Sequence, residues 1–554
     1  MTTTAGTPAG TRAPAAGPRP NRHLAGTGTL LRLALRRDRV MLPAWVLTLG
    51  LITYSTKDRL ESMYATAAER ADLVENTNGS GATRALFGPA FGDSLGALTA
   101  WRVGGFLAVG AGIMSVLLVV RHTREEEETG RQEALASGMV GRRAGVTAAL
   151  LTAVLANAAT AVLVTGPLLG EDPAGAVALG LSVGLTGLVF AALAAVAAQF
   201  TENARLARGI ALGALGIAFL LRMAGDAARD ATTGSGHVLG WLSPLGWAGA
   251  VRPFAGDRWW PLALSALLTA VSAAVAHALV ARRDIGTGFW PARPGPASAG
   301  PALGGVYGLA WRLQRGSLLG WAVGMVFAGA VLGSIADGVG DIIGDNTGAR
   351  DLFRRMGGQE GVSEAFLAAM VSILGLVTTV YTAGSVLRLR GEETGQRAEP
   401  LLSHPVGRLR WAGSHLLIAY LGPAVLLAAG GLALGIGFGA ATGDLGGELP
   451  PVLAAMLAQL PAVWVITGLA VLVVGLLPQL SPAVWGVVGA VVAIGWLGPA
   501  ADLPQWVVDV SPFGHLPKLP GGEVSATPFL WLTGLSVVLP AAGLAALRHR
   551  DLAS

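Results

Sequence analysis

Two short stretches of an otherwise apolar chain gather carboxylate and guanidinium groups. They read REEEETGRQEALASGMVGRR from Arg124 to Arg143 and RGEETGQRAEPLLSHPVGR from Arg390 to Arg408, about 266 residues apart. We call them the first and the second charged segment. Side chains of these types form ion pairs with each other or with an oppositely charged partner surface.

Each charged segment predicts a short amphipathic helix. Glu127 and Arg131 lie four residues apart, and Glu393 and Arg397 repeat that pair, a spacing that stabilises a helix. A more apolar stretch follows in each copy, so we expect the element to lie across the membrane surface with its charged face toward the cytosol. Such a face can dock into a cleft of a soluble partner. The alternative is a loop that only suits the membrane–water interface, and the survival of E-E-T-G in both copies favours docking.

Other chemistry is restricted by what the chain lacks. It contains no cysteine, so it has no disulfide, thiol nucleophile or cysteine metal site, and its 8 histidines form no cluster with ligand spacing. The only lysines are Lys57 and Lys518, and neither follows a glycine as the lysine of a phosphate-binding P-loop does. We therefore expect no Walker A motif, no catalytic residue, no metal site and no cofactor in this chain.

The composition predicts an integral membrane protein. Of the 554 residues, 52% are hydrophobic and only 13% are charged, whereas a soluble domain carries about 25% charged residues. The sequence contains twelve apolar runs, each long enough to cross a bilayer as a helix. They lie at about 40–57, 102–120, 145–168, 175–198, 206–223, 260–280, 317–336, 365–387, 412–441, 450–477, 482–499 and 528–547.

The distribution of charge predicts an orientation for these runs. With the N-terminus in the cytoplasm, most Arg and Lys residues fall in connections on the cytoplasmic side, and most acidic residues fall on the outer side. Both termini and both charged segments are then cytoplasmic. The basic residues border the spans and do not form one stripe, so the net charge of +5 does not indicate nucleic-acid binding.

The chain is predicted to be a tandem duplication. LALRRDRVMLPAW aligns with LAWRLQRGSLLGW, LSPLGW with VSPFGH, and ARRDIG with LRHRDL, in the same order and with nearly the same spacing. We therefore expect an all-α fold of two homologous six-helix halves related by pseudo-two-fold symmetry. The predicted parts are a disordered cytoplasmic tail at 1–27, a first half at 28–283, a cytoplasmic linker at 284–305 and a second half at 306–554.

A resemblance to a known family rests on these motifs. The second charged segment, EETGQRAEPLLSHPVGRLR, is similar to the coupling segment of permease subunits of type-2 (type V) ABC exporters, and LRLALRRDR and YGLAWRLQR resemble the elbow helix of that family. The duplicated form, with LSPLGWAGAVRPFAGDRWW, resembles actinobacterial polyketide-antibiotic exporter permeases of the tetronasin-resistance-like branch. The resemblance covers about residues 28–551. The first copy departs from the pattern, because Met139 stands where the second copy has Pro405.

The resemblance implies a transmembrane subunit of an ATP-dependent exporter in the plasma membrane. A separate ATPase in two copies, which would hold the ATP and Mg, would bind the two coupling segments and drive a hydrophobic or amphipathic, antibiotic- or drug-like molecule out of the cell. The residues expected to couple to the ATPase are Glu127, Glu128, Thr129, Gly130, Arg131, Leu135, Arg142, Glu392, Glu393, Thr394, Gly395, Arg397, Leu401 and Arg408.

In that family the substrate path lies between the halves, along spans one, two and five of each. No Asp, Glu, Lys or Arg falls near the middle of a predicted span, which suits an apolar substrate and argues against ion-coupled transport. Arg222, at the end of span five, is expected to snorkel toward the outer interface. An ion-coupled twelve-span secondary transporter and a non-transporting membrane anchor or regulator of a soluble ATPase remain alternatives. The expected path residues are Trp45, Phe106, Met114, Phe219, Trp321, Phe327, Tyr381 and Trp485.

Overall fold

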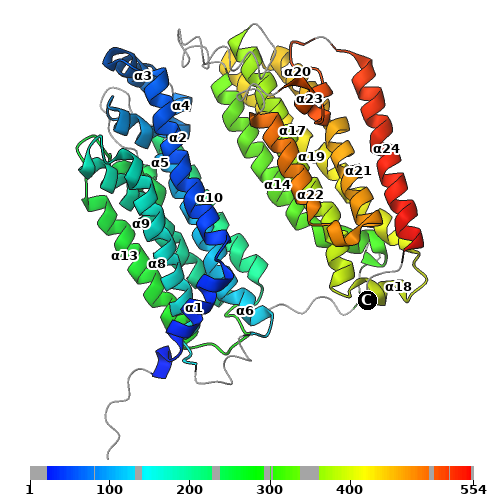
Figure 1. The fold of residues 1–554 in the computed structure, drawn as a ribbon, viewed down its shortest axis with the longest axis horizontal. Helices are drawn as coiled ribbons and strands as arrows, with labels where there is room; N and C mark the ends of the chain where they lie inside the picture. Colours follow the sequence, from blue (N-terminus) through cyan, green and yellow to red (C-terminus); the bar gives the residue numbers. More distant parts are fainter. Residues whose placement is uncertain are drawn as a thin grey trace, which may run out of the picture. The chain divides into compact units, whose positions relative to one another are not determined.

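Apolar runs of the sequence become helices throughout the part of the chain that the computed structural model describes. The chain divides into two units, Met1–Pro294 and Gly295–Ser554, and the division falls within the predicted linker. Figure 1 draws the first unit in blue to green and the second in green to red. The described residues are 22–79, 81–131, 140–227, 238–291, 298, 300, 303–336, 361–497, 504–522 and 524–550.

The first unit is a helix bundle. Its helices are α1 (Thr27–Arg37), α2 (Met41–Met63), α3 (Ala67–Gly79), α4 (Gly81–Phe87), α5 (Leu95–His122), α6 (Arg124–Glu128), α8 (Ala144–Thr165), α9 (Pro173–Phe200), α10 (Ala204–Ala227), α11 (Val238–Trp241), α12 (Pro244–Ala250) and α13 (Trp260–Val280), with short 3-10 helices η1 (Arg22–Leu24) and η2 (Gly166–Leu168).

The second unit is a helix bundle as well. Its helices are α14 (Val306–Ala336), α17 (Val362–Thr394), α18 (Ala398–Leu402), α19 (Arg408–Thr442), α20 (Leu445–Leu457), α21 (Leu460–Leu476), α22 (Ala483–Leu497), α23 (Gln505–Val508) and α24 (Ala526–His549), with 3-10 helices η4 (Pro478–Leu480) and η5 (Pro512–His515).

Ten helical segments in the described part of the chain are long and apolar enough to cross a membrane. Each of the twelve predicted runs coincides with a helix, but two of these helices are not among the ten. The last turns of α2 carry charged residues, including Lys57 and Asp58, and α22 has only 15 residues. Helices α20 and α21 count as one segment, Leu445–Leu476, which is interrupted shortly before Pro461. These helices show that the chain is a multi-pass helical membrane protein.

Small residues allow the helices of each unit to approach closely. In the first unit α9 packs against α5, α8 and α13. At Gly180 of α9, a Cβ atom would lie 2.6 Å from the carbonyl oxygen of Ala161 on α8, so a larger residue would push the two helices apart. The buried core around these helices consists mostly of alanine, valine and leucine side chains.

The connection between α2 and α5 contains a local helix-start motif. The backbone N–H of Thr66 donates to Oε2 of Glu69 at 3.0 Å, and the N–H of Glu69 donates to the Thr66 hydroxyl at 3.3 Å, which together form a capping box for α3. The hydrogen bonds from Thr66, led by the one from its backbone, hold the pKa of Glu69 below its ordinary value. This connection therefore has helical structure of its own.

The first residues of the predicted linker pack on the first unit. The backbone N–H groups of Phe289 and Trp290 donate to the carbonyls of Gln199 and Phe200, at 3.2 and 2.7 Å. The Trp290 ring lies 5.0 Å from the ring of Phe200. Before α1 in the sequence, residues 22–24 of the predicted tail form η1, and residues 1–21 lie outside the described residues.

Both Ser-Pro motifs begin short helices. The Ser243 hydroxyl accepts hydrogen bonds from backbone N–H groups at the start of α12, and the Ser511 hydroxyl does so at the start of η5. Serine and proline at these positions favour helix initiation. The repeated motif of the sequence therefore has the same local role in the two units.

Candidate functional site

The first charged segment continues from the end of α5 into α6 and turns inward at its glutamates. Both carboxylate oxygens of Glu127 are bound by arginines: Nη1 of Arg124 lies at 2.6 Å, and Nη2 of Arg283 lies at 2.5 Å. Only 5% of the Glu127 side chain is exposed, with 0% for Arg124 and 6% for Arg283. Arg283 follows α13, so this group joins the end of α5 to the end of α13.

The second charged segment contains the same group. The Glu393 carboxylate is fully buried, with Nη1 of Arg390 at 2.8 Å and Nη2 of Arg550 within 2.6 and 2.8 Å of its two oxygens. Arg550 follows α24, as Arg283 follows α13. The arginine and glutamate of the charged segment repeat 266 residues apart, and the arginine after the last helix repeats 267 residues apart. We call the two groups the first and the second arginine–glutamate cluster.

A second link joins the same parts of each unit. Arg142 donates from Nε to the carbonyl of Val280 at 3.1 Å and from Nη2 to the carbonyl of Arg283. In the other unit, Nη1 of Arg408 donates to the carbonyl of Arg550 at 2.7 Å. These carbonyls lie at the C-terminal ends of α13 and α24, where a positive charge is favourable. The basic residues that close each charged segment therefore bind the end of the last helix.

The predicted ion pairs join a glutamate to an arginine four residues later. In the structure, each of these arginines instead pairs with the preceding glutamate, five residues before it. Arg131 pairs with Glu126 at 3.6 Å, and Arg397 pairs with Glu392 at 2.9 Å. The reason is that the helix ends before the arginine: Gly130 has φ +72°, and a left-handed residue turns the second copy as well. The glutamates that were expected to meet these arginines are instead held in the arginine–glutamate clusters.

The predicted elbow helix α1 is tied to the first charged segment. Arg37, at its end, forms an ion pair with Glu126. The buried carboxylate of Asp38 binds Nη1 of Arg121 at 2.8 Å and Nε2 of His122 at 2.5 Å. Helix α1 also packs on α8. The elbow, the second span and the charged segment therefore form one polar assembly at this end of the unit.

The residues of the coupling prediction divide into an inward set and an exposed set. Glu127, Glu392 and Glu393 face inward, which differs from the charged face expected to point to the cytosol. Leu401 is half-buried on α18 and packs against the core of the second unit, whereas Leu135 lies outside the described residues. The exposed set comprises Glu128, Thr129, Gly130, Arg131, Arg142, Thr394, Gly395 and Arg397, and Arg408 is half-buried.

The sequence interpretation missed the arginines of the clusters. Arg124 and Arg390 stand three residues before the clustered glutamates, and Arg283 and Arg550 follow the last helices. A signal was available, because the last predicted span of each half is followed by an Arg-Asp dipeptide. Sequence alignment showed that this dipeptide repeats, but only the fold shows that it meets the charged segment.

In the second unit, three of the predicted path residues lie along one side of α17. The rings of Trp321 and Tyr381 meet edge to face at 6.3 Å. Trp485 of α22 lies against α17 one turn further on, 3.9 Å from the position of a Cβ atom at Gly384, and 46% of it is exposed. Phe327 is half-buried on α14. Trp321 and Tyr381 are therefore neighbours, although only 3% of Tyr381 is exposed, and Trp485 contacts the same helix; their role in a substrate path stays a prediction.

The predicted path residues of the first unit do not form such a group. Met114 is buried in the core, and Trp45 and Phe219 pack against that core while partly exposed. Phe106 is 41% exposed and meets the ring of Phe87 edge to face at 5.8 Å. Both Phe106 and Met114 lie on α5, but Phe106 is at the surface of the unit and Met114 is in its interior.

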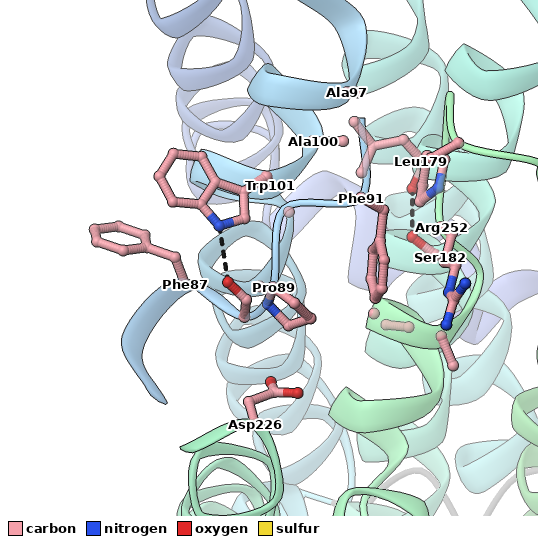
Figure 2. Close-up of a pocket in the computed structure, with 18 of the residues that line it drawn as sticks. Phe87, Pro89, Phe91, Ala97, Ala100, Trp101, Leu179, Ser182, Asp226 and Arg252 are labelled. Carbon is pink, nitrogen blue, oxygen red and sulfur yellow. Dashed lines mark hydrogen bonds between the residues drawn. The ribbon is translucent and has the colours of Figure 1, made fainter. Parts of the chain in front are cut away.

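A cavity of about 80 Å³ lies at the opposite end of the first unit from its charged segment (Figure 2). Aromatic side chains surround it: Phe87, Phe91 and Trp101. The Trp101 indole donates to the carbonyl of Gly88 at 2.8 Å, and the Arg252 guanidinium lies 4.1 Å from the centre of the Phe91 ring. None of the eight predicted path residues lines this cavity.

The same cavity is bordered by an ion pair. Nε of Arg222 lies 3.0 Å from Oδ2 of Asp226, and the Arg222 side chain is 6% exposed. Its guanidinium fits against glycines, because a Cβ atom at Gly105 would lie 2.6 Å from Nη1 and one at Gly88 would lie 2.9 Å from Nη2. The expectation that Arg222 snorkels outward was wrong, because a neighbouring carboxylate and glycine-lined space hold it inside.

Comparison with known proteins places the chain in a family. The family described as "Multidrug efflux system permease Rv1217c, C-terminal domain" matches residues 303–548. The "Multidrug efflux system permease protein Rv1217c" of Mycobacterium tuberculosis is 44% identical over 547 residues, which cover 98% of this chain and 98% of the relative. Similarity of this extent includes both charged segments and both units. The chain therefore belongs to the multidrug efflux system permease family.

Proposed function

We propose that this protein is the permease subunit of an ATP-driven exporter of hydrophobic or amphipathic drug-like molecules. The observation that carries the proposal is the 44% identity to a multidrug efflux permease over nearly the whole of both chains. In this proposal twelve helices cross the plasma membrane as two homologous halves, of the type-2 (type V) ABC class, with both termini in the cytoplasm.

The energy source is a separate ATPase in two copies. The chain has only two lysines, and neither follows a glycine as a P-loop lysine does. The surface proposed to bind the ATPase is the exposed part of each charged segment, together with the exposed face of α18 in the second unit. Glu399 lies on that face. The clustered glutamates lie behind this surface.

The proposed substrate path is lined by the first, second and fifth spans of each half. In the second unit, Trp321, Tyr381 and Trp485 come from the three helices expected to line it. Aromatic faces suit flat apolar molecules and organic cations, and they adapt to several substrates better than a fixed set of charges does. These aromatic side chains support the proposal of an amphipathic or hydrophobic substrate.

The experiment is reconstitution in proteoliposomes with the ATPase that co-purifies from the native membrane. We expect ATP hydrolysis stimulated by a drug-like substrate, together with ATP-dependent accumulation of that substrate in inside-out vesicles. Transport driven by a proton or sodium gradient without ATP would instead favour a secondary transporter. ATP hydrolysis without any transport would favour a membrane anchor or regulator.

The docking surface has its own test. Glu399→Arg reverses a charge on the exposed face of α18 and should reduce the amount of ATPase that co-purifies, because charge complementarity sets such contacts. The matched control is Glu75→Arg, an exposed glutamate of α3 beyond the opposite end of the spans, which should leave the complex unchanged. Equal recovery of the ATPase with both variants would remove α18 from the docking surface.

A further inference from the structure

The two arginine–glutamate clusters connect parts of the chain that are far apart in sequence. In the first unit, Glu127 follows α5 and its partner Arg283 follows α13. In the second unit, Glu393 ends α17 and its partner Arg550 follows α24. Each cluster therefore ties the base of a charged segment to the end of the last helix of the same unit.

Burial makes this connection a firm one. A carboxylate removed from water is stable only when several charged or hydrogen-bonding partners replace the water. Glu127 and Glu393 each receive two guanidinium groups, one from three residues earlier and one from the last helix. Separating a glutamate from these arginines would leave buried charges without partners, so the cluster is expected to move as one body.

The neighbouring ion pairs lack this property. The arginines that pair with Glu126 and Glu392 in the turns of the charged segments have side chains 58% and 63% exposed. Water can replace such partners at little cost. The charged segment therefore has an adaptable exposed turn and a buried base that is fixed to the last helix.

The backbone contact of the same region strengthens the connection. Arg142 and Arg408, at the far ends of the two charged segments, donate to the carbonyls of Arg283 and Arg550. Each segment is thus attached to the last helix at both of its ends. The two units repeat this arrangement although their other residues have diverged.

We propose that Glu127 and Glu393 are positioning residues that transmit displacement of the charged segments to the last helix of each unit, α13 and α24. This inference rests on the proposed function, because an ATPase must supply the displacement. It assigns E-E-T-G a second role besides docking. The clustered glutamate is the first of the E-E pair in the first copy and the second in the second copy, because each stands three residues after the arginine of its cluster.

The test measures coupling in the complete complex of permease and ATPase. Glu393→Gln removes the charge and keeps the shape of the side chain, and Glu448→Gln on α20 is the matched control. We expect Glu393→Gln to retain the ATPase and to hydrolyse ATP, while substrate transported per ATP falls by roughly tenfold, the scale of coupling changes at network residues. The control should keep the wild-type ratio.

A covalent cross-link in place of the ion pair between residues 393 and 550 provides the complementary experiment. The chain contains no cysteine, so Glu393→Cys with Arg550→Cys can be joined by a short bifunctional thiol reagent without background reaction. We expect the reduced double variant to be uncoupled and the cross-linked one to recover transport per ATP to within about twofold of the wild type. If Glu393→Gln does not accumulate, Arg550→Lys is the milder variant, with the same expected loss.

The outcomes separate this inference from the proposed function. An unchanged transport ratio in Glu393→Gln or Arg550→Lys would overturn the inference and leave the exporter intact. Loss of the ATPase from the Glu393→Gln complex would also overturn it, because the glutamate would then belong to the docking surface. Loss of transport on cross-linking would overturn it as well, because the cluster would then have to open during transport. Absence of ATP-driven transport in the wild type would overturn the proposed function, and this inference with it.

Discussion

At the scale of single residues, the glutamates of the charged segments have two different environments. Glu128 is exposed, whereas Glu127 and Glu393 are buried between arginines. The sequence pattern could not distinguish them, because consecutive glutamates have the same chemistry and only the end of the helix decides which one turns inward. The residue types of the site were predictable from the sequence, and their partners were not.

Trp101 gives a prediction at this scale. Its indole N–H donates to the carbonyl of Gly88 beside the cavity of Figure 2, and its ring packs against Phe87. Trp101→Phe should lower the free energy of unfolding by about 1–3 kcal/mol, because a buried carbonyl loses its donor. Thermal unfolding in detergent measures the change.

The control for that prediction is an exposed tryptophan. Trp506 is 72% exposed on α23, so Trp506→Phe should leave the unfolding temperature nearly unchanged. Equal shifts for the two variants would mean that the hydrogen bond to Gly88 contributes nothing measurable.

At the scale of helices, the apolar runs of the sequence predicted the elements well. Each predicted run coincides with a helix, since about 20 consecutive apolar residues have few other stable structures in a membrane. The short helices α12 and η5 and the packing of α1 were not predictable in the same way, because they depend on contacts between segments. Close packing between long helices also depends on contacts between segments, so it was not predictable from the apolar runs either.

The contact between α14 and α19 gives a prediction at this scale. A Cβ atom at Gly333 would lie 2.1 Å from the carbonyl oxygen of Leu434, and one at Gly329 would lie 2.4 Å from that of Gly430. These glycines, four residues apart, allow the two backbones to touch. Gly333→Leu should separate the helices and lower stability by about 1–3 kcal/mol or more.

The same helix supplies the control. Gly320 of α14 has no atom within 4 Å of a Cβ position, so Gly320→Leu should be tolerated. The recovery of monodisperse protein and its thermal unfolding compare the two variants. A Gly333→Leu protein as stable as Gly320→Leu would contradict the close packing of α14 on α19.

At the scale of the whole molecule, the chain consists of two helical units that repeat a local arrangement of charged residues. The repeat itself was predictable, because the motifs recur in the same order. The physical basis of the repeat was not predictable, because the survival of E-E-T-G was interpreted only as evidence of docking to a partner. The clusters around Glu127 and Glu393 instead give an internal reason for a glutamate three residues after an arginine in both copies.

The central claim is that both charged segments lie on the cytoplasmic side, where one ATPase assembly can reach them. The chain has no cysteine, and Thr129 and Thr394 are exposed at the two turns. Single cysteines at these positions can therefore be labelled with a membrane-impermeant thiol reagent, in intact cells and in inside-out vesicles. We expect labelling of both Thr129→Cys and Thr394→Cys in the vesicles only, with protection when the ATPase is bound. Labelling of either position in intact cells would contradict the central claim.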